Sequence, residues 1–587
     1  MTQTAFPARS EADWRKAAEA ALKGGAFDKL VSVTADGLSL GPLAAGRAGP
    51  RALRGEPGPW KALARLDHPG ADDFAAQARE DLDNGADGLT VVFAGAGAAY
   101  GFGLSRSDSA GLHRAFDGVR LDQGKRIRLE IADFEQARAF AALAVRSGAD
   151  VARMDLAFGL DPLGARARSG VADHNSGALV HTAAALRRRG FAGPFAAADG
   201  RAVHDAGGTP AQELAFALSA GVSYLRALEN PAQIEFRLAA DADQFATLAK
   251  FRALRLLWSR VEQACGLEPT PIRLSASSAW RMMSAVEPFV NVMRAALAAF
   301  SAGLGGADDV TLLPFAQAIG LPDAFARRLA RNTQLIELRE ARLGFVADPA
   351  AGAGGFETLT EGLCEKAWGL FQSFEAAGGL DKALERGLVQ LAVVSSAAKL
   401  MRDVARAKTP LTGVSAHPHL GADRIAVLPD VAAPPVAGEG ALASMRLSEP
   451  FERLREAGRA APKMFLAALG PLAAHSRRVG FARELFEAGG IEIIAGAGAD
   501  SADALAQEFR VSGAGLACLC GTDEAYAEGA EAFAGVLKRA GAVVVYLAGR
   551  AGEHEAAWRA AGVDGFVYAG ADLVAALTEA LRAARDA

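Results

Sequence analysis

Cysteine is scarce in this sequence of 587 residues, which contains only four. They stand at Cys265, Cys364, Cys518 and Cys520, without the spacing of a four-ligand metal site. So few cysteines cannot form a disulfide framework for a chain of this size. We therefore expect free thiols, no bound metal and a reducing, cytoplasmic environment.

The sequence also lacks an excess of positive charge and a long apolar run. Lys and Arg number 63 against 68 Asp and Glu, so the net charge is −5 and no basic field is available to hold a nucleic-acid backbone. The most apolar segment, residues 540–549, is about half of the roughly 20 residues that a helix needs to cross a bilayer. Residues 1–16 mix charges and contain no signal-peptide core. We expect neither nucleic acid nor a membrane as a partner.

Aromatic residues are few, at 7% of the chain, although hydrophobic residues make up 51%. The cores must then be built mainly from Ala, Leu and Val, which suits α/β layers with closely packed helices. The chain is too long for a single core, and its length favours two to four domains.

Short β-rich runs alternate with amphipathic stretches from about residue 72 to residue 315, as in a parallel sheet with crossover helices. The candidate strands are Gly88–Ala94, Ile127–Ala132, Val151–Phe158, Pro194–Ala198, Val222–Ala227, Ile234–Ala239, Ile272–Ala276 and Val310–Phe315. Eight such strands predict a (β/α)8 barrel. The fifth and sixth candidates are separated only by residues 228–233, too few for a crossover helix, so the strand count is open there.

Helical patterns follow over residues 240–265 and, apart from the strand at Val310, from residue 279 to about residue 407, and these helices are expected to wrap the barrel. Residues 409–440 hold five prolines and four glycines, a composition typical of an irregular linker, and a short helix is expected at Glu449–Ala457.

A second alternation after residue 461 predicts a flavodoxin-like, doubly wound domain. Its candidate strands are Met464–Leu469, Ile491–Ile494, Gly515–Leu519, Val543–Leu547 and Gly565–Tyr568. The predicted organisation is therefore an N-terminal arm over residues 1–70, a barrel with wrapping helices over 71–407, a linker over 408–460 and the second domain over 461–587.

Seven short segments spread over the helical region carry a family resemblance. They are Phe289 with Asn291 and Arg294, Gly303–Asp308, Leu321-Pro322, Ala330–Gln334, Asp348-Pro349, Glu357–Thr360 and Phe374–Gly379. In this order and at these spacings they make the chain resemble the methylmalonyl-CoA mutases. The resemblance implies an acyl-CoA-binding barrel followed by a cobalamin-binding domain. The reaction of the family is the adenosylcobalamin-dependent interconversion of (R)-methylmalonyl-CoA and succinyl-CoA.

The cobalamin motif of the family is degenerate in this chain. In catalytic members the histidine of Asp-x-His-x-x-Gly ligates cobalt, and the aspartate fixes its tautomer. If His475 is matched to that ligand, Ala473 replaces the aspartate and Arg478 replaces the glycine, and the spacing from Gly470 is one residue longer. A Gly-Gly that lies against the nucleotide tail of the cofactor becomes Gly549-Arg550. We expect His475 to be an ordinary residue near a helix start.

The substrate site that the resemblance implies is degenerate as well. Arg54-Gly55 is followed almost at once by Gly58-Pro59-Trp60, so the family segment that carries a tyrosine over the cofactor is missing. The family histidine that polarises the thioester carbonyl aligns with Ala202, and His204 stands two positions late and is expected to be structural.

The resemblance thus implies the small, non-catalytic subunit of a heterodimer, with no catalytic, cofactor-binding or metal-binding residues of its own. Adenosylcobalamin is expected in the partner, a large, homologous catalytic subunit. The stretch Ala12–Leu30 reaches over the partner in family members and is the interface candidate, unless it packs on its own barrel. Two alternatives stay open: a competent mutase with the unorthodox ligands His475 and His204, and a free-standing acyl-CoA-binding regulator.

Overall fold

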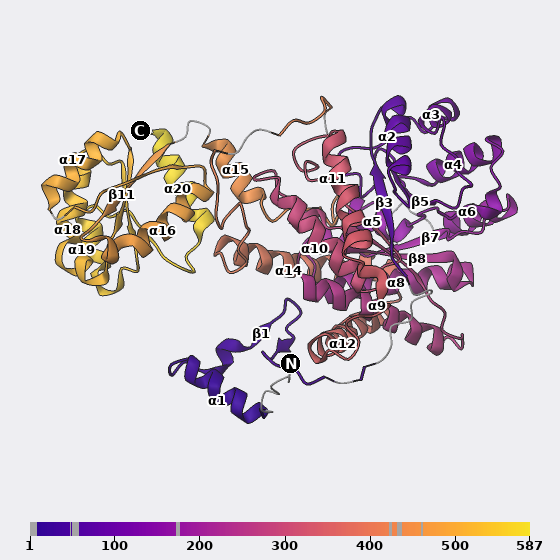
Figure 1. Cartoon of the computed structure of the whole chain (residues 1–587), viewed down its shortest axis with the longest axis horizontal. Helices are drawn as coiled ribbons and strands as arrows, with labels where there is room; N and C mark the ends of the chain where they lie inside the picture. The colour runs from indigo at the N-terminus through magenta and orange to yellow at the C-terminus, as the bar shows by residue number, and fades with distance from the viewer. Residues whose placement is uncertain are drawn as a thin grey trace, which may run out of the picture.

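The computed structural model describes residues 9–46, 48–49, 58–171, 176–421, 425–430, 437–458, 462–499 and 501–586. An eight-stranded parallel sheet in the order β6-β5-β4-β3-β10-β9-β8-β7 forms its larger domain (Figure 1). A parallel bridge between Leu160 and Ala196 joins the two ends of this order, so the sheet is a closed barrel, as predicted. The strands are β3 (Lys61–Leu66), β4 (Gly88–Val92), β5 (Arg126–Glu130), β6 (Leu156–Ala157), β7 (Ala196–Asp199), β8 (Ile234–Ala240), β9 (Arg273–Ser278) and β10 (Asp309–Thr311).

Helices surround this barrel and continue after its last strand. Those between the strands are α2 (Ala71–Asp83), α3 (Ser109–Ala115), α4 (Phe134–Arg146), α5 (Pro162–Ser169), α6 (Ser176–Arg188), α7 (Arg201–Asp205), α8 (Pro210–Leu228), α9 (Gln244–Ala264) and α10 (Val290–Leu304). After β10 come α11 (Ala324–Leu335), the π-helix η5 (Ile336–Glu340), α12 (Gly354–Ala376), α13 (Leu380–Glu385) and α14 (Leu388–Ala405). The long helix α12 packs against both α8 and α9.

One strand prediction for the barrel is wrong, and one strand was not predicted. Residues 222–227 form the last part of α8, and the strand β3 at Lys61–Leu66 was missed. Helix α8 is buried on nearly all sides, so its apolar residues show no helical stripe and resemble a buried strand. Strand β3 mixes Ala and Leu with Lys and Arg, residues of low strand propensity. The barrel sheet therefore begins at residue 61, before the predicted start at residue 71.

The smaller domain is the predicted flavodoxin-like one, with a parallel sheet in the order β12-β11-β13-β14-β15. Its strands are β11 (Lys463–Ala468), β12 (Glu492–Ala495), β13 (Leu516–Cys520), β14 (Val544–Ala548) and β15 (Gly565–Val567). The helices are α16 (Leu472–Ala488), α17 (Ala502–Ser512), α18 (Asp523–Arg539), α19 (Glu555–Ala560) and α20 (Leu573–Asp586). Cys518 and Cys520 are free, buried thiols on one face of β13.

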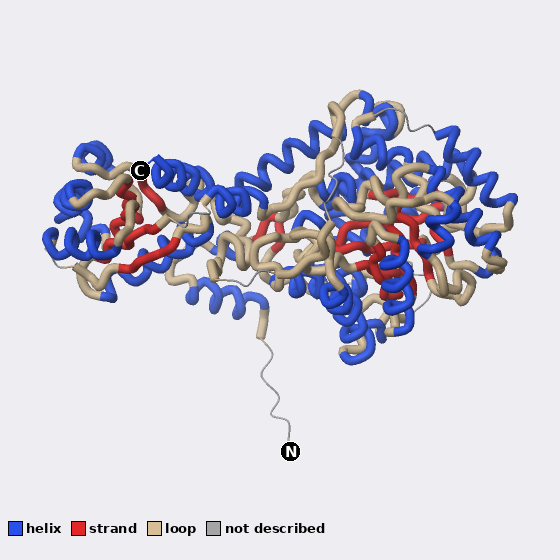
Figure 2. Tube along the Cα trace, turned by 90° about the horizontal axis from the view of Figure 1, so that it is seen from above, coloured by secondary structure: helices blue, strands red, loops and turns tan. Residues whose placement is uncertain are grey.

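The two domains lie at opposite ends of the long axis of the molecule, as both views show (Figures 1 and 2). Helix α15 (Glu449–Ala457) joins them, and its Phe451 and Leu454 pack into the core of the smaller domain. At the other end of the chain, α1 (Glu11–Ala21) and η1 (Phe27–Leu30) project from the body (Figure 1), whereas the hairpin of β1 (Ser32–Val33) and β2 (Ser39–Leu40) packs on α12.

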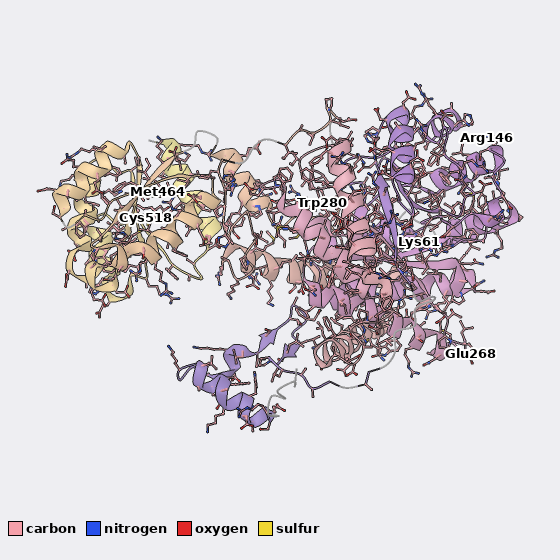
Figure 3. All side chains as sticks on the ribbon, in the orientation of Figure 1. Lys61, Arg146, Glu268, Trp280, Met464 and Cys518 are labelled. Carbon is pink, nitrogen blue, oxygen red and sulfur yellow. The ribbon has the colours of Figure 1, made fainter. Side chains whose placement is uncertain are left out.

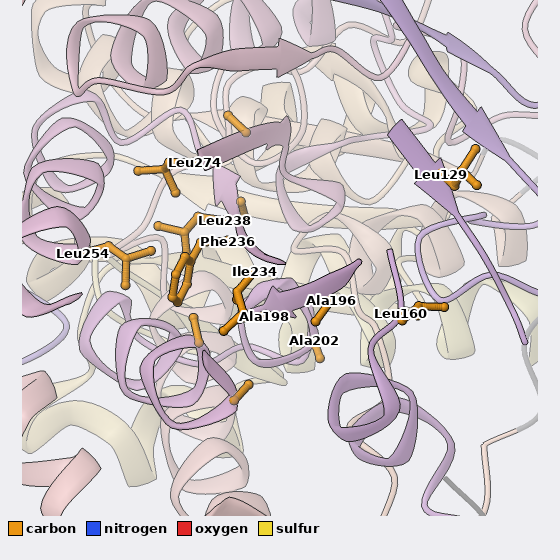
Figure 4. Close-up of a cluster of buried hydrophobic side chains, with 14 of the residues drawn as sticks. Leu129, Leu160, Ala196, Ala198, Ala202, Ile234, Phe236, Leu238, Leu254 and Leu274 are labelled. Atoms are coloured by element: carbon orange, nitrogen blue, oxygen red, sulfur yellow. The ribbon is translucent and has the colours of Figure 1, made fainter. Parts of the chain in front are cut away.

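Outward-facing side chains of the barrel strands make the apolar core between sheet and helices. On β8, Ile234, Phe236 and Leu238 belong to this core together with Leu254 of α9 (Figure 4). The residues between them, Glu235 and Arg237, point to the other face, because side chains alternate along a strand. The interior of the barrel is therefore lined by charge rather than by branched apolar residues.

Gly303 of α10 is expected to be essential for close packing on Trp60. A Cβ atom at residue 303 would lie 2.3 Å from the Trp60 ring, whereas a Cβ at Gly369 of α12 would meet nothing within 4 Å. Gly303→Ala should lower the free energy of unfolding by about 1–3 kcal/mol through overpacking. The matched control Gly369→Ala should raise it by about 0.5–1 kcal/mol through its helix propensity. Urea denaturation measures both, and equal changes would contradict the packing at Trp60.

Candidate functional site

Ion pairs fill the interior of the barrel near the N-terminal ends of its strands. The Asp155 carboxylate lies 2.7 Å from Lys61 Nζ, 3.0 Å from Arg126 Nε and 3.0 Å from an Nη atom of Arg273. Asp309 of β10 accepts from Arg126 at 2.6 Å and from Arg128 at 3.1 Å, so these pairs reach across the barrel. The basic groups outweigh the effect of burial and lower the pKa of Asp155 to about 2.

A second layer of ion pairs centres on Glu130 of β5. Its carboxylate accepts from Arg201 at 2.9 Å and from Arg237 at 3.1 Å, and Arg237 also binds Glu235. Burial opposes ionisation of Glu130, but the guanidinium groups of Arg201 and Arg237 lower its pKa to about 2. Arg201 donates further to Asp199 at 2.8 Å. These side chains are almost fully buried, at 5% exposure or less.

Arg128 closes the remaining space between these layers. Its guanidinium donates to Ser277 and to Thr311, both at 2.9 Å, and is 1% exposed. The Thr311 hydroxyl oxygen lies 2.6 Å from the Thr90 hydroxyl oxygen across the same space. Two cavities, of about 480 and 430 Å3, lie among helices outside the sheet, and a third, between β3 and α11, has only about 10 Å3. That is about the room for one water molecule.

Two aromatic rings lie at the C-terminal ends of the strands, the end at which (β/α)8 barrels hold their active sites. Tyr100 and Trp280 are stacked, with ring centroids 4.7 Å apart and an interplanar angle of 8°. Tyr100 donates to Asp205 at 2.8 Å, and Arg65 faces its ring at 5.6 Å. This mouth is therefore filled by side chains of the chain itself.

The structure places the predicted barrel residues Ala202 and His204 in the short buried helix α7. Ala202 lies in α7, 1% exposed, within the apolar core. His204 is 1% exposed, with Nδ1 3.2 Å from Glu213 and Nε2 3.2 Å from Asp241, and Lys250 also pairs with Glu213. The imidazole of His204 therefore lies between two carboxylates, and its structural role stays a prediction. Arg54 and Gly55 lie outside the described residues.

The degenerate motif of the smaller domain lies in the first turns of α16. His475 is 5% exposed, and its Nδ1 lies 3.1 Å from the Gly470 carbonyl oxygen, a backbone partner in place of a carboxylate. Ala473 of the same turn is exposed. The Arg478 guanidinium covers the Tyr526 ring at 4.8 Å and pairs with Asp523.

Gly549 lies directly against these groups. A Cβ at this position would be 3.2 Å from Arg478 and 3.2 Å from the Tyr526 ring. Arg550, the next residue, faces the ring of Tyr568 at 4.7 Å. The space beside Gly549 is thus already occupied by a guanidinium and an aromatic ring.

Sequence reasoning missed Tyr526 and the arginines of the barrel. The Tyr526 hydroxyl accepts from Gly521 N at 2.9 Å and lies 3.0 Å from the carbonyl oxygens of Leu519 and Ala548, so it ties the ends of β13 and β14 together. No pattern in the sequence predicts that Tyr526 links these two strands. The inward position of the barrel arginines could have been predicted, because charged residues alternate with apolar ones at residues 126–130 and 234–238.

Asp161 follows β6 and begins α5 at the same end of the barrel as Trp280. Its Oδ1 accepts from Tyr224 at 2.5 Å and from Gly164 N at 2.9 Å, while Oδ2 is buried without a hydrogen-bond partner among the described residues. Burial, assisted by the nearby charge of Asp199, raises the pKa of Asp161 to about 7. This carboxyl group therefore keeps its proton far above the ordinary range.

Within the described ranges, no three His, Cys, Asp or Glu side chains are grouped as a metal site. His417 and His419 each face one carboxylate, Glu484 at 3.1 Å and Glu287 at 3.2 Å, and both are exposed. Among the helices that the structure describes, none is long and apolar enough to cross a membrane.

Comparisons with known proteins agree on one family. The family model described as "Methylmalonyl-CoA mutase" matches residues 49–428. The chain is 39% identical to the methylmalonyl-CoA mutase small subunit of Streptomyces virginiae over 98% of this chain and 97% of the relative. It is 36% identical to the small subunit of Propionibacterium freudenreichii subsp. shermanii, over 76% and 72%. It is also 36% identical to the methylmalonyl-CoA mutase of Rhizobium meliloti, but over only 36% and 32%.

Asp161→Asn should stabilise the protein in a pH-dependent way. Because the folded-state pKa of about 7 lies above the ordinary 3.8, the folded chain holds a proton that the unfolded chain releases, and the free energy of unfolding falls as pH rises through this window. The neutral Asn avoids that loss. Urea denaturation should therefore show the variant more stable than the parent at about pH 8 and without this advantage near pH 4.

Asp243→Asn is the control for replacing an N-cap carboxylate by an amide, because Asp243 is the exposed N-cap of α9. An Asp161→Asn advantage that is equal at both pH values would contradict a buried, protonated Asp161.

Proposed function

This chain belongs to the methylmalonyl-CoA mutase family, and on that premise we propose that it is the non-catalytic small subunit of an adenosylcobalamin-dependent mutase. Its partner is then a large, homologous subunit that interconverts (R)-methylmalonyl-CoA and succinyl-CoA. The relatives that match most of its length are named small subunits, a name that implies a larger one.

The observation that carries the proposal is the ion-paired interior of the barrel. An acyl-CoA would need a cavity of several hundred Å3 among these strands. To open one, Arg201 or Arg237 would have to leave Glu130, and breaking a buried pair of this kind costs about 3–5 kcal/mol because it leaves an uncompensated charge. The arginines therefore favour a barrel that serves as a rigid body rather than as a substrate site.

The residues of the smaller domain do not fit a cobalamin. The cobalt-ligating histidine of the family is paired with an aspartate, whose negative charge raises its basicity, whereas His475 faces the neutral carbonyl oxygen of Gly470. A nucleotide tail would need the backbone of Gly549 to be open, whereas Arg478 and Tyr526 lie against it. These contacts support the absence of the cofactor from this chain, and the radical chemistry is assigned to the partner.

The N-terminal arm supports the existence of a partner. Helix α1 has no buried residue, although Trp14 packs on Phe27 with ring centroids 6.1 Å apart and Arg15 covers Phe27 at 4.2 Å. The arm contacts the larger domain further along the chain, where the Asp36 carboxylate accepts a hydrogen bond from the backbone N–H of Ala211 in α8. A helix such as α1, with no side chain buried against its own barrel, is typical of a segment that binds another protein.

Incubation with adenosylcobalamin followed by desalting tests the loss of the cofactor site. The purified chain should retain no stoichiometric corrin absorbance, because the groove for the tail is filled. Calorimetric titration with CoA and succinyl-CoA should likewise give no binding heat. One equivalent of retained corrin would instead favour a competent mutase, and a saturable CoA-ester signal alone would favour an acyl-CoA-binding regulator.

Trp14→Ala should weaken association with the large homologous subunit. Loss of a central aromatic contact lowers the affinity of an interface by roughly 10- to 100-fold. Phe245→Ala is the control, because Phe245 is an exposed aromatic residue outside the arm that likewise contacts a second ring, Phe356, with centroids 5.1 Å apart. Co-purification and a titration of the two subunits measure the effect; equal affinities for both variants would remove the arm from the interface.

A further inference from the structure

Residues 437–448, here called the strap, lie across the C-terminal mouth of the barrel. Each of four backbone N–H groups donates to a backbone carbonyl of the barrel loops. The pairs are Gly438 to Ser169 (2.8 Å), Leu442 to Ala167 (2.8 Å), Met445 to Asp205 (2.9 Å) and Leu447 to Arg281 (3.0 Å). These acceptors follow β6, β7 and β9, so the strap joins three loops of the mouth.

A column of side chains continues from the strap into the barrel. The Arg446 guanidinium faces the Trp280 ring at 5.3 Å, Trp280 stacks on Tyr100, and Arg65 faces Tyr100. Arg65 is a residue of β3 and is paired with Asp67 at 2.7 Å. The strap is thereby connected to the barrel wall through two stacked rings between two arginines, an arrangement with favourable cation–π contacts at both ends.

Glu452 of α15 connects the same strap to the smaller domain. Its carboxylate accepts from Arg446 twice, at 2.5 and 2.7 Å, from Ser448 Oγ at 2.6 Å and from Ala285 N at 2.9 Å. Arg446 and Glu452 are only 12% and 14% exposed. Phe451, the residue before Glu452, is fully buried in the core of the smaller domain.

The column therefore lies where the two domains meet. Figure 3 shows Trp280 on the side of the barrel toward the smaller domain, between Lys61 and the residues Met464 and Cys518. Val404 of α14 and Val414 pack in the same apolar cluster as Phe451, whereas a linker rich in Pro and Gly does not by itself fix a domain orientation. The bidentate Arg446–Glu452 pair has a fixed geometry, which a flexible tether lacks.

We propose that the strap is an interdomain lock, in which Arg446 couples the Trp280–Tyr100 stack in the barrel mouth to Glu452 of α15 and so fixes the orientation of the smaller domain without any bound ligand. The lock goes beyond the proposed function, because it concerns how one chain holds its own domains.

Distance measurements between two spin labels on the full chain test the lock. The exposed native Cys265 at the end of α9 takes one label, and a cysteine introduced by Val511→Cys, at a position 82% exposed in the smaller domain, takes the other. Cys364→Ser removes the half-buried thiol, while Cys518 and Cys520 are buried. The parent should give a narrow distance distribution.

Arg446→Ala and Glu452→Gln should each broaden this distribution at least about twofold, since domain motion is the default without a firm interface. The backbone amides of Leu442 and Met445 should also exchange hydrogen faster. Arg226→Ala is the matched control, because it removes an Arg–Glu pair between α8 and α12 within the barrel and should leave the width unchanged.

An unchanged width in Arg446→Ala, with unchanged exchange at Leu442 and Met445, would overturn the lock. If Arg446→Ala does not fold, Arg446→Lys takes its place, because it keeps the charge but loses the bidentate geometry. Broadening with Lys supports the proposal, and a width equal to that of the parent contradicts it.

Discussion

The arginine–carboxylate network inside the barrel is the interaction on which the rest of the structure depends. A buried guanidinium requires a charged or hydrogen-bonding partner, so every inward arginine dictates the residue that faces it on another strand. The Glu130 carboxylate forms ion pairs with both Arg201 and Arg237, and the Asp309 carboxylate forms ion pairs with Arg126 and Arg128. These pairs connect β5 with α7, β8 and β10 across the interior of the barrel and occupy the space between them.

The smaller domain shows the same separation of fold from chemistry. Its five strands keep the flavodoxin-like order, and the crevice at the carboxyl ends of such strands is the usual place for a ligand. Here Tyr526 bonds the ends of β13 and β14, and Arg478 lies on its ring. In both domains, then, arginine side chains pack at the carboxyl ends of the parallel strands.

The sequence predicted the positions of strands and helices more accurately than it predicted the side-chain contacts between them. All five strands of the smaller domain are apolar runs between turn residues, and each was located correctly; β3 and the end of α8 were not, because composition and periodicity mislead there. The degenerate positions Ala473, Arg478 and Ala202 could be found by alignment to a motif. The partners of Arg446 could not, because Trp280 and Glu452 come from two separate elements and meet only in the folded chain.

The interlocked charges of the barrel also limit how this lineage can change. Reopening the interior would require several residues, among them Arg128, Arg201, Arg237 and Glu130, to be replaced together. Each intermediate with one charge removed would leave another stranded, at a cost comparable to much of the 5–15 kcal/mol by which typical proteins are stable. Single substitutions among these four residues are therefore expected to cost more stability than substitutions on the surface.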